Sequence, residues 1–328
     1  MDARFALLKL LADGGFHSGA SLARATGIRG GALTRQLERL SAWGVELRGT
    51  PGHGYRLGQR LDLLDATKIR AGLSAASAAR VRRLTVEPEV DSTNTALLTE
   101  THLPIGQHDV MLAEFQTAGR GRRGRVWRAP LGSGICLSLS LNLSRPNSDV
   151  AALGLAAGVA VLRALKRRGV TGLALKWPND VLAGEAKLAG ILCELRAEST
   201  GPSYVVVGVG INVRLPAATE AALAAEGTRV TDLMRVAPGI GSRSELAADL
   251  VNELVAMAAE FEQRGFAAYQ AEWAAADALN GRAISVHDQR GVRGGIARGI
   301  AADGTLCVEL ASGMTQLTAG DVTLRPLT

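Results

Sequence analysis

Aromatic residues are scarce in this chain, at 4% of its 328 positions. Apolar residues nevertheless reach 47%, so the core must be built mainly from alanine, leucine, valine and isoleucine. Long apolar runs are also missing, and none approaches the roughly 20 residues that a membrane-spanning helix needs. Residues 1–5 lack the charged-then-apolar layout of a signal peptide. We therefore expect a cytoplasmic protein that does not enter a membrane.

Cysteine is rare as well, and its three copies are far apart: Cys136, Cys193 and Cys307. This odd number and wide spacing exclude both a disulfide framework and a tetrahedral metal site. We expect three reduced cysteines.

Positive charge is concentrated near the N-terminus. The net charge is +6, and the first sixty residues carry nine basic and four acidic residues, whereas the remainder carries 28 and 27. A basic end on a nearly neutral body favours a polyanionic partner for that end. A solvated basic surface without a partner is the alternative.

The same N-terminal stretch predicts a winged helix-turn-helix domain over residues 1–60. A helix is expected at 5–12, a second from the cap Ser18 to about residue 26, and a third up to about residue 43. A hairpin follows at 45–57 and forms the wing. Arg35, Gln36 and Arg39 lie away from the leucines of the third helix and are candidate DNA contacts. Because the Gly-Gly pair at 30–31 weakens that helix, a regulatory or packing module is the alternative.

The rest of the chain predicts an α+β fold. Residues 61–84 are expected to be a linker with short helices, and a mixed α/β domain follows at 85–280. Strands are expected at 110–114, 134–143, 173–177, 191–195 and 204–213, and helices at 93–100, 149–168 and 243–264. Helices and strands do not alternate one for one, which argues against a strictly parallel sheet. Short strands within 281–328 predict a small antiparallel barrel.

A basic glycine loop at 119–125 is the most unusual stretch. It holds four arginines and three glycines directly after a predicted strand. Glycine allows close approach and positive φ, backbone N–H groups can form an anion-binding nest, and arginine binds phosphate or carboxylate. No Gly-Lys-Ser/Thr follows, so it is not a P-loop. We expect a loop that binds an anion and is mobile when empty; an RNA-binding or solvated turn is the alternative.

Three other segments carry candidate chemistry. Lys187 opens an apolar strand, where a buried ammonium group needs an anionic partner; a turn residue with a free head group is the alternative. Asp180 is a candidate metal ligand or hydrogen-bonding carboxylate. Residues 91–94 can cap a helix or hold a polar ring. Alternating glycines at 208–210 indicate close approach by a ligand or by neighbouring backbone, and a tightly packed strand is the alternative. Asn212 could reach a base edge.

In chain order, these motifs resemble those of biotin–protein ligases. They are Asp-Ser-Thr-Asn at 91–94, Gln-x-x-Gly-Arg-Gly-Arg-Arg-Gly-Arg-x-Trp at 116–127, Lys-Trp-Pro-Asn-Asp at 176–180, Lys-Leu-Ala-Gly-Ile-Leu at 187–192 and Gly-x-Gly-Ile-Asn at 208–212. With a winged helix in front, the chain resembles the bacterial bifunctional form, which also represses the biotin operon. The resemblance extends from about residue 6 to the C-terminus.

The resemblance implies an ATP-dependent, AMP-forming ligase that uses Mg²⁺. It would convert biotin and ATP to biotinyl-5′-AMP and pass biotin to a lysine of the biotin carboxyl carrier protein of acetyl-CoA carboxylase. It also implies operator DNA as a partner, a homodimer when the adenylate is bound, and an SH3-like C-terminal barrel at 281–328. Open alternatives are a ligase whose winged helix is only regulatory, a ligand-sensing DNA-binding regulator without ligase activity, and a lipoate–protein ligase, which the arginine-rich loop disfavours.

The resemblance also implies roles for individual residues. Lys187 and Arg122 would be catalytic, and Asp180 would bind the metal. Biotin would be bound by Ser92, Thr93, Asn94, Gln116, Arg120, Gly121, Arg122 and Lys187. ATP and the adenylate would be bound by Arg120, Arg122, Arg123, Trp127, Asn179, Lys187 and Asn212.

Overall fold

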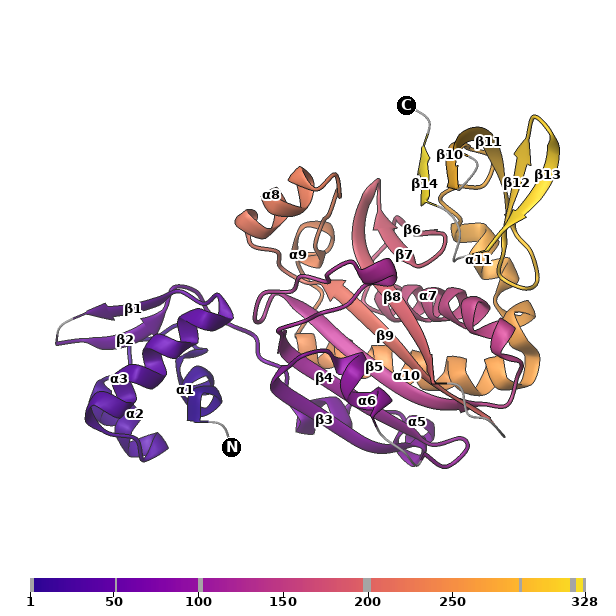
Figure 1. The fold of residues 1–328 in the computed structure, drawn as a ribbon. Coiled ribbons are helices and arrows are strands. Elements are labelled where there is room, and N and C mark those ends of the chain that lie inside the picture. Colours follow the sequence, from indigo (N-terminus) through magenta and orange to yellow (C-terminus); the bar gives the residue numbers. More distant parts are fainter. Residues whose placement is uncertain are drawn as a thin grey trace.

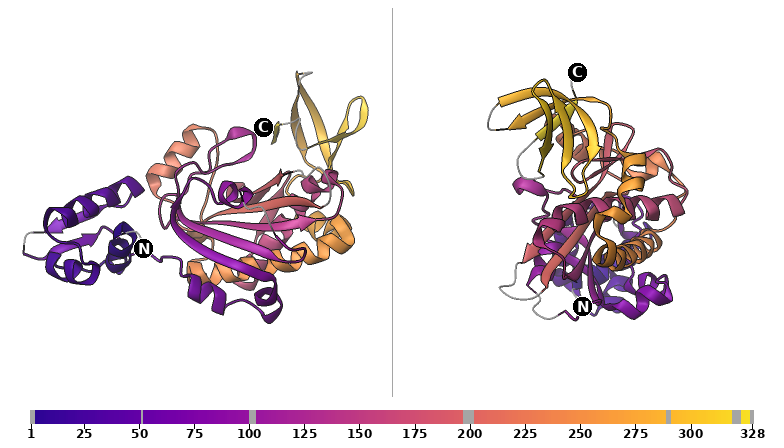
Figure 2. Two further views of the ribbon diagram at one scale, coloured as in Figure 1. Left: turned by 60° about the horizontal axis from the view of Figure 1, so that its bottom comes forward. Right: turned by 90° about the vertical axis from the view of Figure 1, so that its right-hand side faces the viewer.

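The computed structural model describes residues 3–50, 52–99, 103–196, 202–288, 291–318 and 323–326. The chain forms three successive units: a small N-terminal unit that projects to one side, a large central unit, and a small C-terminal sheet (Figures 1 and 2). No helix among these residues combines the length and the apolar character needed to cross a membrane.

The N-terminal unit is a winged helix, as predicted. Its elements are α1 (Ala3–Leu11), α2 (Gly19–Thr26), α3 (Gly30–Glu38), the 3-10 helix η1 (Arg39–Trp43), and the antiparallel strands β1 (Leu47–Thr50) and β2 (Gly54–Leu57). Ser18 Oγ accepts a hydrogen bond from the backbone N–H of Ser21 at 3.0 Å, and Gly27 ends α2 with φ 74°. The predicted third helix is wrong in its last turn, because the α-helix ends at Glu38 and tightens into η1.

The winged helix packs against the central unit through side chains as well as through the connecting chain. Leu61, Phe115 and Leu131 join the apolar cluster formed by the leucines and Trp43 of the winged helix. The indole N–H of Trp43 also donates to the carboxylate of Glu89. The two units therefore share a small apolar contact.

The predicted linker at 61–84 folds onto the central unit. It contains α4 (Ala66–Ala71) and α5 (Ala75–Arg80), which contact α10 (Arg243–Arg264), and it contributes the buried side chains of Leu64 and Ile69 to the main core. Strand β3 (Val81–Val90) begins four residues before the predicted start of the central domain at 85. Small alanine-rich helices leave few large apolar residues to reveal this packing in the sequence.

The central unit is built on a seven-stranded mixed sheet with the strand order β3-β4-β5-β9-β8-β7-β6. Only the β3–β4 pair is parallel, which agrees with the expected α+β class. Its other strands are β4 (His108–Gln116), β5 (Gly134–Leu143), β6 (Leu173–Lys176), β7 (Asp180–Ala183), β8 (Ala186–Arg196) and β9 (Ser203–Asn212).

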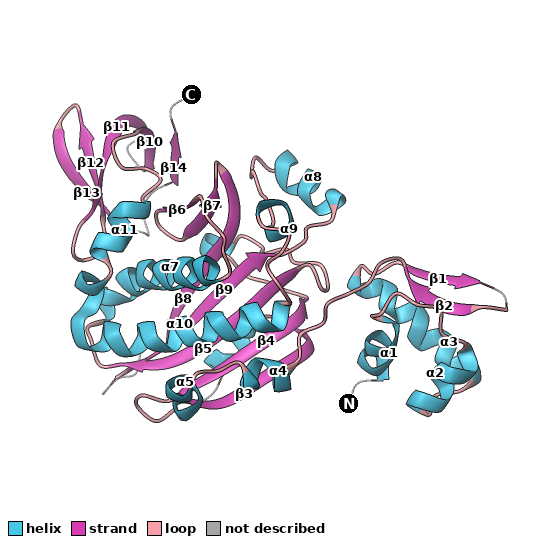
Figure 3. Ribbon diagram, turned by 180° about the vertical axis from the view of Figure 1, so that it is seen from behind, coloured by secondary structure: helices cyan, strands magenta, loops and turns pink. Residues whose placement is uncertain are grey.

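Helices cover the two faces of this sheet unequally. The long helices α7 (Val150–Arg167) and α10 lie together across one face, whereas the short α6 (Thr93–Leu98) lies on the other (Figures 1 and 3). The helix α11 (Gln270–Ala276) packs against α7 and β6, and the short helices α8 (Ala217–Ala225) and α9 (Leu233–Val236) follow β9 in the chain. In β9, valines alternate with glycines, and Val207 and Val209 enter the main core. The glycines of β9 therefore face the side that α6 covers only in part.

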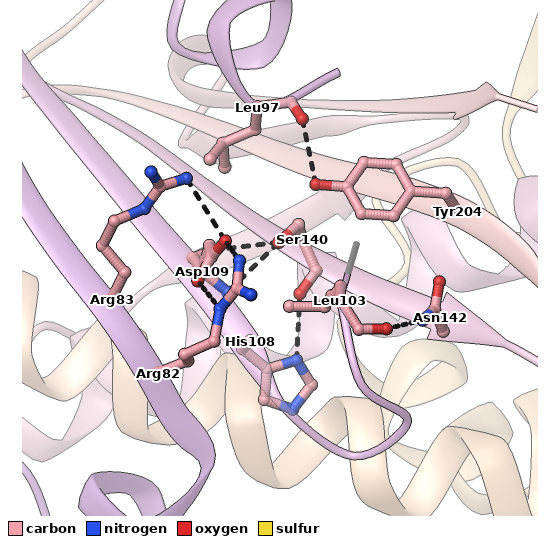
Figure 4. A network of polar contacts seen from close by, with 9 residues as sticks. All are labelled: Arg82, Arg83, Leu97, Leu103, His108, Asp109, Ser140, Asn142 and Tyr204. Carbon is pink, nitrogen blue, oxygen red and sulfur yellow. Dashed lines mark hydrogen bonds and ion pairs between the residues drawn. The ribbon is translucent and has the colours of Figure 1, made fainter. Parts of the chain in front are cut away.

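A buried polar network braces the sheet at the start of β4 (Figure 4). The carboxylate of Asp109 accepts hydrogen bonds from Arg82 Nε at 2.9 Å and from Arg83 Nη2 at 3.3 Å. His108 Nδ1 donates to the carbonyl of Ser140 at 3.0 Å, because a carbonyl oxygen can only accept. Burial lowers the pKa of His108.

The C-terminal unit is an antiparallel sheet with the order β13-β12-β11-β10-β14. Its strands are β10 (Ala283–Asp288), β11 (Gly291–Ile300), β12 (Leu306–Leu310), β13 (Gly313–Leu317) and β14 (Thr323–Pro326). Among the described residues, β13 and β14 do not pair with each other, so the expected closed barrel is not found there. The indole N–H of Trp177 donates to the carbonyl of Gly304 at 3.0 Å and ties this sheet to the central unit.

Candidate active site

A large cavity opens on the face of the central sheet opposite α7 and α10. Its volume is about 1140 Å³. Most of the site residues predicted from the sequence line it: Ser92, Thr93, Asn94, Gln116, Arg120, Gly121, Arg122, Trp127, Asn179, Asp180, Lys187 and Asn212. Arg123 does not; it lines a smaller cavity of about 410 Å³ beside the same loop.

The polar end of the cavity is formed where α6 begins. Ser92 occupies the N-cap position, but its side chain makes no capping hydrogen bond, so the helix-capping interpretation of Ser92 is wrong. Gln116 takes that role instead, because its Oε1 accepts hydrogen bonds from Thr93 N at 2.8 Å and from Thr93 Oγ1 at 3.2 Å. Thr93 is therefore held at the cavity wall by Gln116, and the residues Ser92 and Thr93 are only 3% and 4% exposed.

Asn94 is fixed entirely by contacts within the protein. Its Nδ2 donates to the carbonyl of Leu192 at 3.1 Å and to Glu194 Oε2 at 2.9 Å, while its Oδ1 accepts from Ser138 Oγ at 2.6 Å. Both amide hydrogens are consumed by these bonds. A Cβ atom at Gly208 would lie 2.3 Å from Asn94 Oδ1, so only glycine permits this close approach. The close approach predicted at the glycines of β9 is present at Gly208, but its neighbour is a side chain rather than a ligand or backbone.

The basic loop is folded on itself like a small hairpin. Gly121 N donates to the carbonyl of Arg125 at 2.7 Å, and Trp127 N donates to that of Gly119 at 2.9 Å. These N–H groups are therefore not open to an anion, and the predicted backbone nest is in part already satisfied. Arg123 adopts the left-handed conformation with φ 57°. The loop can consequently contact an anion more through its arginine side chains than through its backbone.

Trp127 ends this loop and lies flat against the sheet. A Cβ atom at Gly210 would lie 2.4 Å from the indole ring, so the ring and strand β9 are in direct contact. Lys187 Nζ lies 5.7 Å from the centre of the same ring. The indole therefore lies beside Lys187, to which the resemblance assigns contacts with both biotin and the adenylate.

Lys187, Arg122 and Arg120 each lie near a carboxylate or another arginine. Lys187 Nζ lies 2.6 Å from Asp180 Oδ1, which confirms that an anion pairs this lysine and excludes the free head group. Burial lowers the pKa of the Arg122 guanidinium, as does the nearby charge of Arg123, whereas Asp180 acts in the opposite direction. Arg120 pairs with Glu194. Burial and Arg123 thus disfavour the charged form of Arg122, and a bound anion would stabilise that form.

The whole cavity wall is strongly positive. Eight lysines and arginines line it, against three aspartates and glutamates. A low-dielectric cavity with such an excess concentrates anionic ligands. The cavity thus combines an uncharged polar end with a cationic end.

Two of the predicted nucleotide contacts are used for structure. Asn212 is 4% exposed, and its Nδ2 donates to the carbonyls of Thr231 at 3.1 Å and Lys187 at 3.4 Å. Asn179 Nδ2 donates to the carbonyl of Ile191 at 2.9 Å. Neither amide nitrogen is directed at a ligand, although both residues border the cavity.

Several wall residues were missed by the sequence analysis. They are Arg125, Arg128, Lys176, Arg229 and Arg282 among the cations, and residues 226–230 and 278–279. Lys176 opens a recognised motif and could have been found there. Arg282 comes from the junction with the C-terminal sheet, more than 90 residues beyond Lys187 in the chain, and no local signal identifies it.

The candidate DNA contacts lie far from the cavity, on the winged helix. Arg35 is exposed on α3 and Arg39 is exposed on η1, whereas Gln36 is partly buried. The two arginines are therefore the accessible members of the set.

Comparisons with known proteins agree with this division of the chain. A model of the biotin/lipoate A/B protein ligase family matches residues 86–212, an HTH domain matches residues 3–56, and the biotin protein ligase C-terminal domain matches residues 281–325. The bifunctional ligase/repressor BirA of Escherichia coli is 34% identical over 320 residues, which cover 97% of this chain and 96% of that protein. The chain belongs to the biotin protein ligase family. Its three domains follow the order of the ligase/repressor members.

Other relatives are similar over shorter parts. The biotin–[acetyl-CoA-carboxylase] ligase of Mycobacterium tuberculosis is 35% identical over 268 residues, covering 79% of this chain and 95% of that protein. The solved structure of the biotin protein ligase from Aquifex aeolicus in complex with biotin and ATP superposes with a TM-score of 0.62 at 26% identity, covering 75% of this chain and all of that one.

Proposed function

We propose that this chain activates biotin with ATP to biotinyl-5′-AMP and transfers biotin to a lysine of a biotin carboxyl carrier protein. The carrying observation is the cavity itself. It joins a buried, uncharged polar end at Ser92 and Thr93 to a cationic end at Arg122 and Lys187. Biotin has the matching form, with an uncharged polar ring and a terminal carboxylate.

In the first reaction a carboxylate oxygen of biotin attacks the α-phosphorus of ATP, and the bond to pyrophosphate breaks. Two anions must approach each other, so the positive charges of Lys187 and Arg122 stabilise the transition state more than the separated reactants. Lys187 first has to exchange Asp180 for the ligand, because the two are paired at 2.6 Å. In the second reaction the amine of the carrier lysine attacks the acyl carbon, AMP leaves, and the amine loses a proton.

Mg²⁺ fits this cavity as a companion of ATP. Among the described residues, no three histidine, cysteine, aspartate or glutamate side chains gather as a metal cage. Mg²⁺ commonly binds to one or two carboxylates together with substrate phosphates and water. Asp180 would supply the carboxylate, and the ion would neutralise phosphate charge.

The loop and Trp127 complete the proposed adenylate site. Arg120, Arg122 and Arg123 would cover the acyl phosphate, and exclusion of water would protect the mixed anhydride. Trp127 would border the adenine, with Asn179 and Asn212 holding the strands beneath it. Ser92, Thr93 and Gln116 would bind the biotin ring, and Asn94 would support them.

We further propose that the winged helix represses a biotin operon. Arg35 and Arg39 would contact operator DNA, with Gln36 beside them, and the adenylate-bound protein would be a homodimer. The +5 charge of the first sixty residues favours DNA over a purely structural role. In the same proposal the C-terminal sheet closes as an SH3-like barrel.

Pyrophosphate exchange with biotin, compared with lipoate, tests the enzyme. Biotin-dependent exchange is expected, whereas exchange with lipoate alone would identify a lipoate ligase and no exchange would leave a ligand-sensing regulator. A gel shift with the biotin-operon promoter, with and without biotin and ATP, tests the repressor. If no adenylate-dependent shift is seen at low salt, the winged helix is only a regulatory module of a ligase.

A further inference from the structure

Glu194 has no role in the proposed chemistry, yet its carboxylate joins two parts of the cavity. It lies at the end of β8. Both of its carboxylate oxygens accept hydrogen bonds from Nη2 of Arg120, in the basic loop. One of them also accepts from Asn94 Nδ2 at 2.9 Å, at the polar end of the cavity. The side chain is 24% exposed, so solvent screens these bonds only in part.

The contacts continue from Asn94 around the polar end. Ser138 Oγ lies 2.6 Å from Asn94 Oδ1 and 2.7 Å from Thr93 Oγ1, and Ser138 is fully buried. Thr93 in turn donates to Gln116 Oε1. Because an amide oxygen can only accept, the hydroxyl of Ser138 must donate to Asn94. The single hydroxyl hydrogen of Thr93 is then shared between Ser138 Oγ at 2.7 Å and Gln116 Oε1 at 3.2 Å.

The series closes into a ring. Its two ends, Gln116 and Arg120, are four residues apart in the chain. A displacement of Arg120 is therefore opposed by the same contacts that orient Thr93 and Asn94. Glu194 is the charged member that makes this closure, since both of its carboxylate oxygens accept from Arg120.

We propose that Glu194 is a positioning residue that couples the biotin-ring end of the cavity to the position of the basic loop. It holds Asn94 through one hydrogen bond and Arg120 through an ion pair, so the ring-binding groups and the loop move together. The proposal rests on the proposed ligase function and assigns no catalytic step to Glu194.

Two substitutions separate the two contacts. Glu194→Gln keeps an oxygen that can accept from Asn94 but removes the charge that holds Arg120. We expect a KM for biotin within about twofold of wild type, together with release of biotinyl-5′-AMP that is roughly three- to tenfold faster. Glu194→Ala removes both contacts and leaves a buried amide N–H of Asn94 unpaired, so the KM for biotin should also rise, on the order of tenfold.

The measurements are biotin-dependent pyrophosphate exchange, which gives KM and kcat, and the half-life of the enzyme-bound adenylate. Glu272→Gln is the matched control, because Glu272 forms an ion pair with Arg163 that is remote from the cavity. A cycle that combines Glu194→Gln with Arg120→Met reports the coupling directly. The double variant should release the adenylate no faster than the faster single variant.

The outcomes are distinct. If Glu194→Gln shows the wild-type exchange kinetics and retains the adenylate as long as wild type, the positioning role is overturned. Additive effects of the two substitutions in the cycle would overturn it as well. Either result leaves the ligase function intact. If both Glu194 variants show the same rise in KM, the same fall in kcat and the same fall in Tm, Glu194 is a general structural residue and not a positioning residue. Absence of exchange in the wild type would overturn both proposals.

Discussion

Arg243 should be the most stability-critical charged residue at the joint between the former linker and the sheet. Its side chain is 3% exposed at the start of α10. The guanidinium donates to Glu114 Oε2 at 2.8 Å, to the carbonyl of Asp62 at 2.7 Å and to that of Gly134 at 3.0 Å. Glu114 is 2% exposed and also accepts from the backbone N–H of Leu64. One guanidinium therefore satisfies a buried carboxylate and two backbone carbonyls.

The substitution Arg243→Met keeps much of the side-chain volume but leaves that carboxylate without a counterion. Removing one partner of a buried ion pair typically costs about 3–5 kcal/mol. In a domain of this size each kcal/mol lowers Tm by roughly 2–4 °C, so we expect a decrease of roughly 6–20 °C. Differential scanning calorimetry at pH 7 measures it.

The matched control is Arg235→Met. Arg235 also forms a bidentate pair, with Glu220 at 2.7 and 2.6 Å, but its side chain is 48% exposed. Because solvent screens an exposed pair, its loss should lower the Tm far less than the loss of Arg243. The double variant Arg243→Met/Glu114→Leu should be more stable than Arg243→Met alone, since it contains no unpaired buried charge. Equal Tm values for the two arginine variants, or a double variant less stable than the single one, would refute this reasoning.

Three further predictions concern single residues. Lys187→Ala should lower the rate of biotin-dependent pyrophosphate exchange by at least about a hundredfold with an unchanged Tm, and a normal rate would remove Lys187 from the mechanism. Gly210→Ala should displace the ring of Trp127, which lies 2.4 Å from the added Cβ, and raise the KM for ATP by about tenfold or more; an unchanged KM would separate Trp127 from the nucleotide. Burial lowers the pKa of His108 from its ordinary value of 6.5, so the unfolded chain binds the proton first and folding free energy is lost as the pH falls below 6.5. Urea midpoints at pH 7 and 5 should therefore differ less for His108→Gln than for wild type, and an equal difference would contradict the assignment.

The strongest local patterns predicted the fold best. The limits of β5 and α10 agree with the expected 134–143 and 243–264, because each is a long segment with a consistent apolar period. Only the end of strand β3, at residues 89–90, was expected, since Val81–Val90 contains arginines, glutamates and a proline. It lies at the edge of the sheet and pairs only with β4, where a proline and charged residues are tolerated. The short polar strand β13 was missed for the same reason.

Many of the residues that line the cavity were predicted from the sequence, but the hydrogen bonds between them were not. Sequence motifs identified Thr93, Asn94 and Arg120, because each stands in an unusual local pattern. They did not reveal Ser138, which looks like an ordinary polar residue in an apolar strand, or the role of Glu194. The pairing of β5, β9 and β8 brings these last two to Asn94, and register is a long-range property that local spacing does not encode.

The same dependence on long-range contacts explains why the role of Asn94 in the structure differs from the role predicted from the sequence. In the sequence, an asparagine next to Ser92 and Thr93 is one more group able to bind a polar ring. In the structure, its two amide hydrogens and its oxygen are used by Leu192, Glu194 and Ser138. An amide that is so completely satisfied inside the protein contributes to recognition by fixing its neighbours. Composition and motif therefore predict which residues surround a ligand, whereas the count of occupied donors and acceptors decides which of them remain able to touch it.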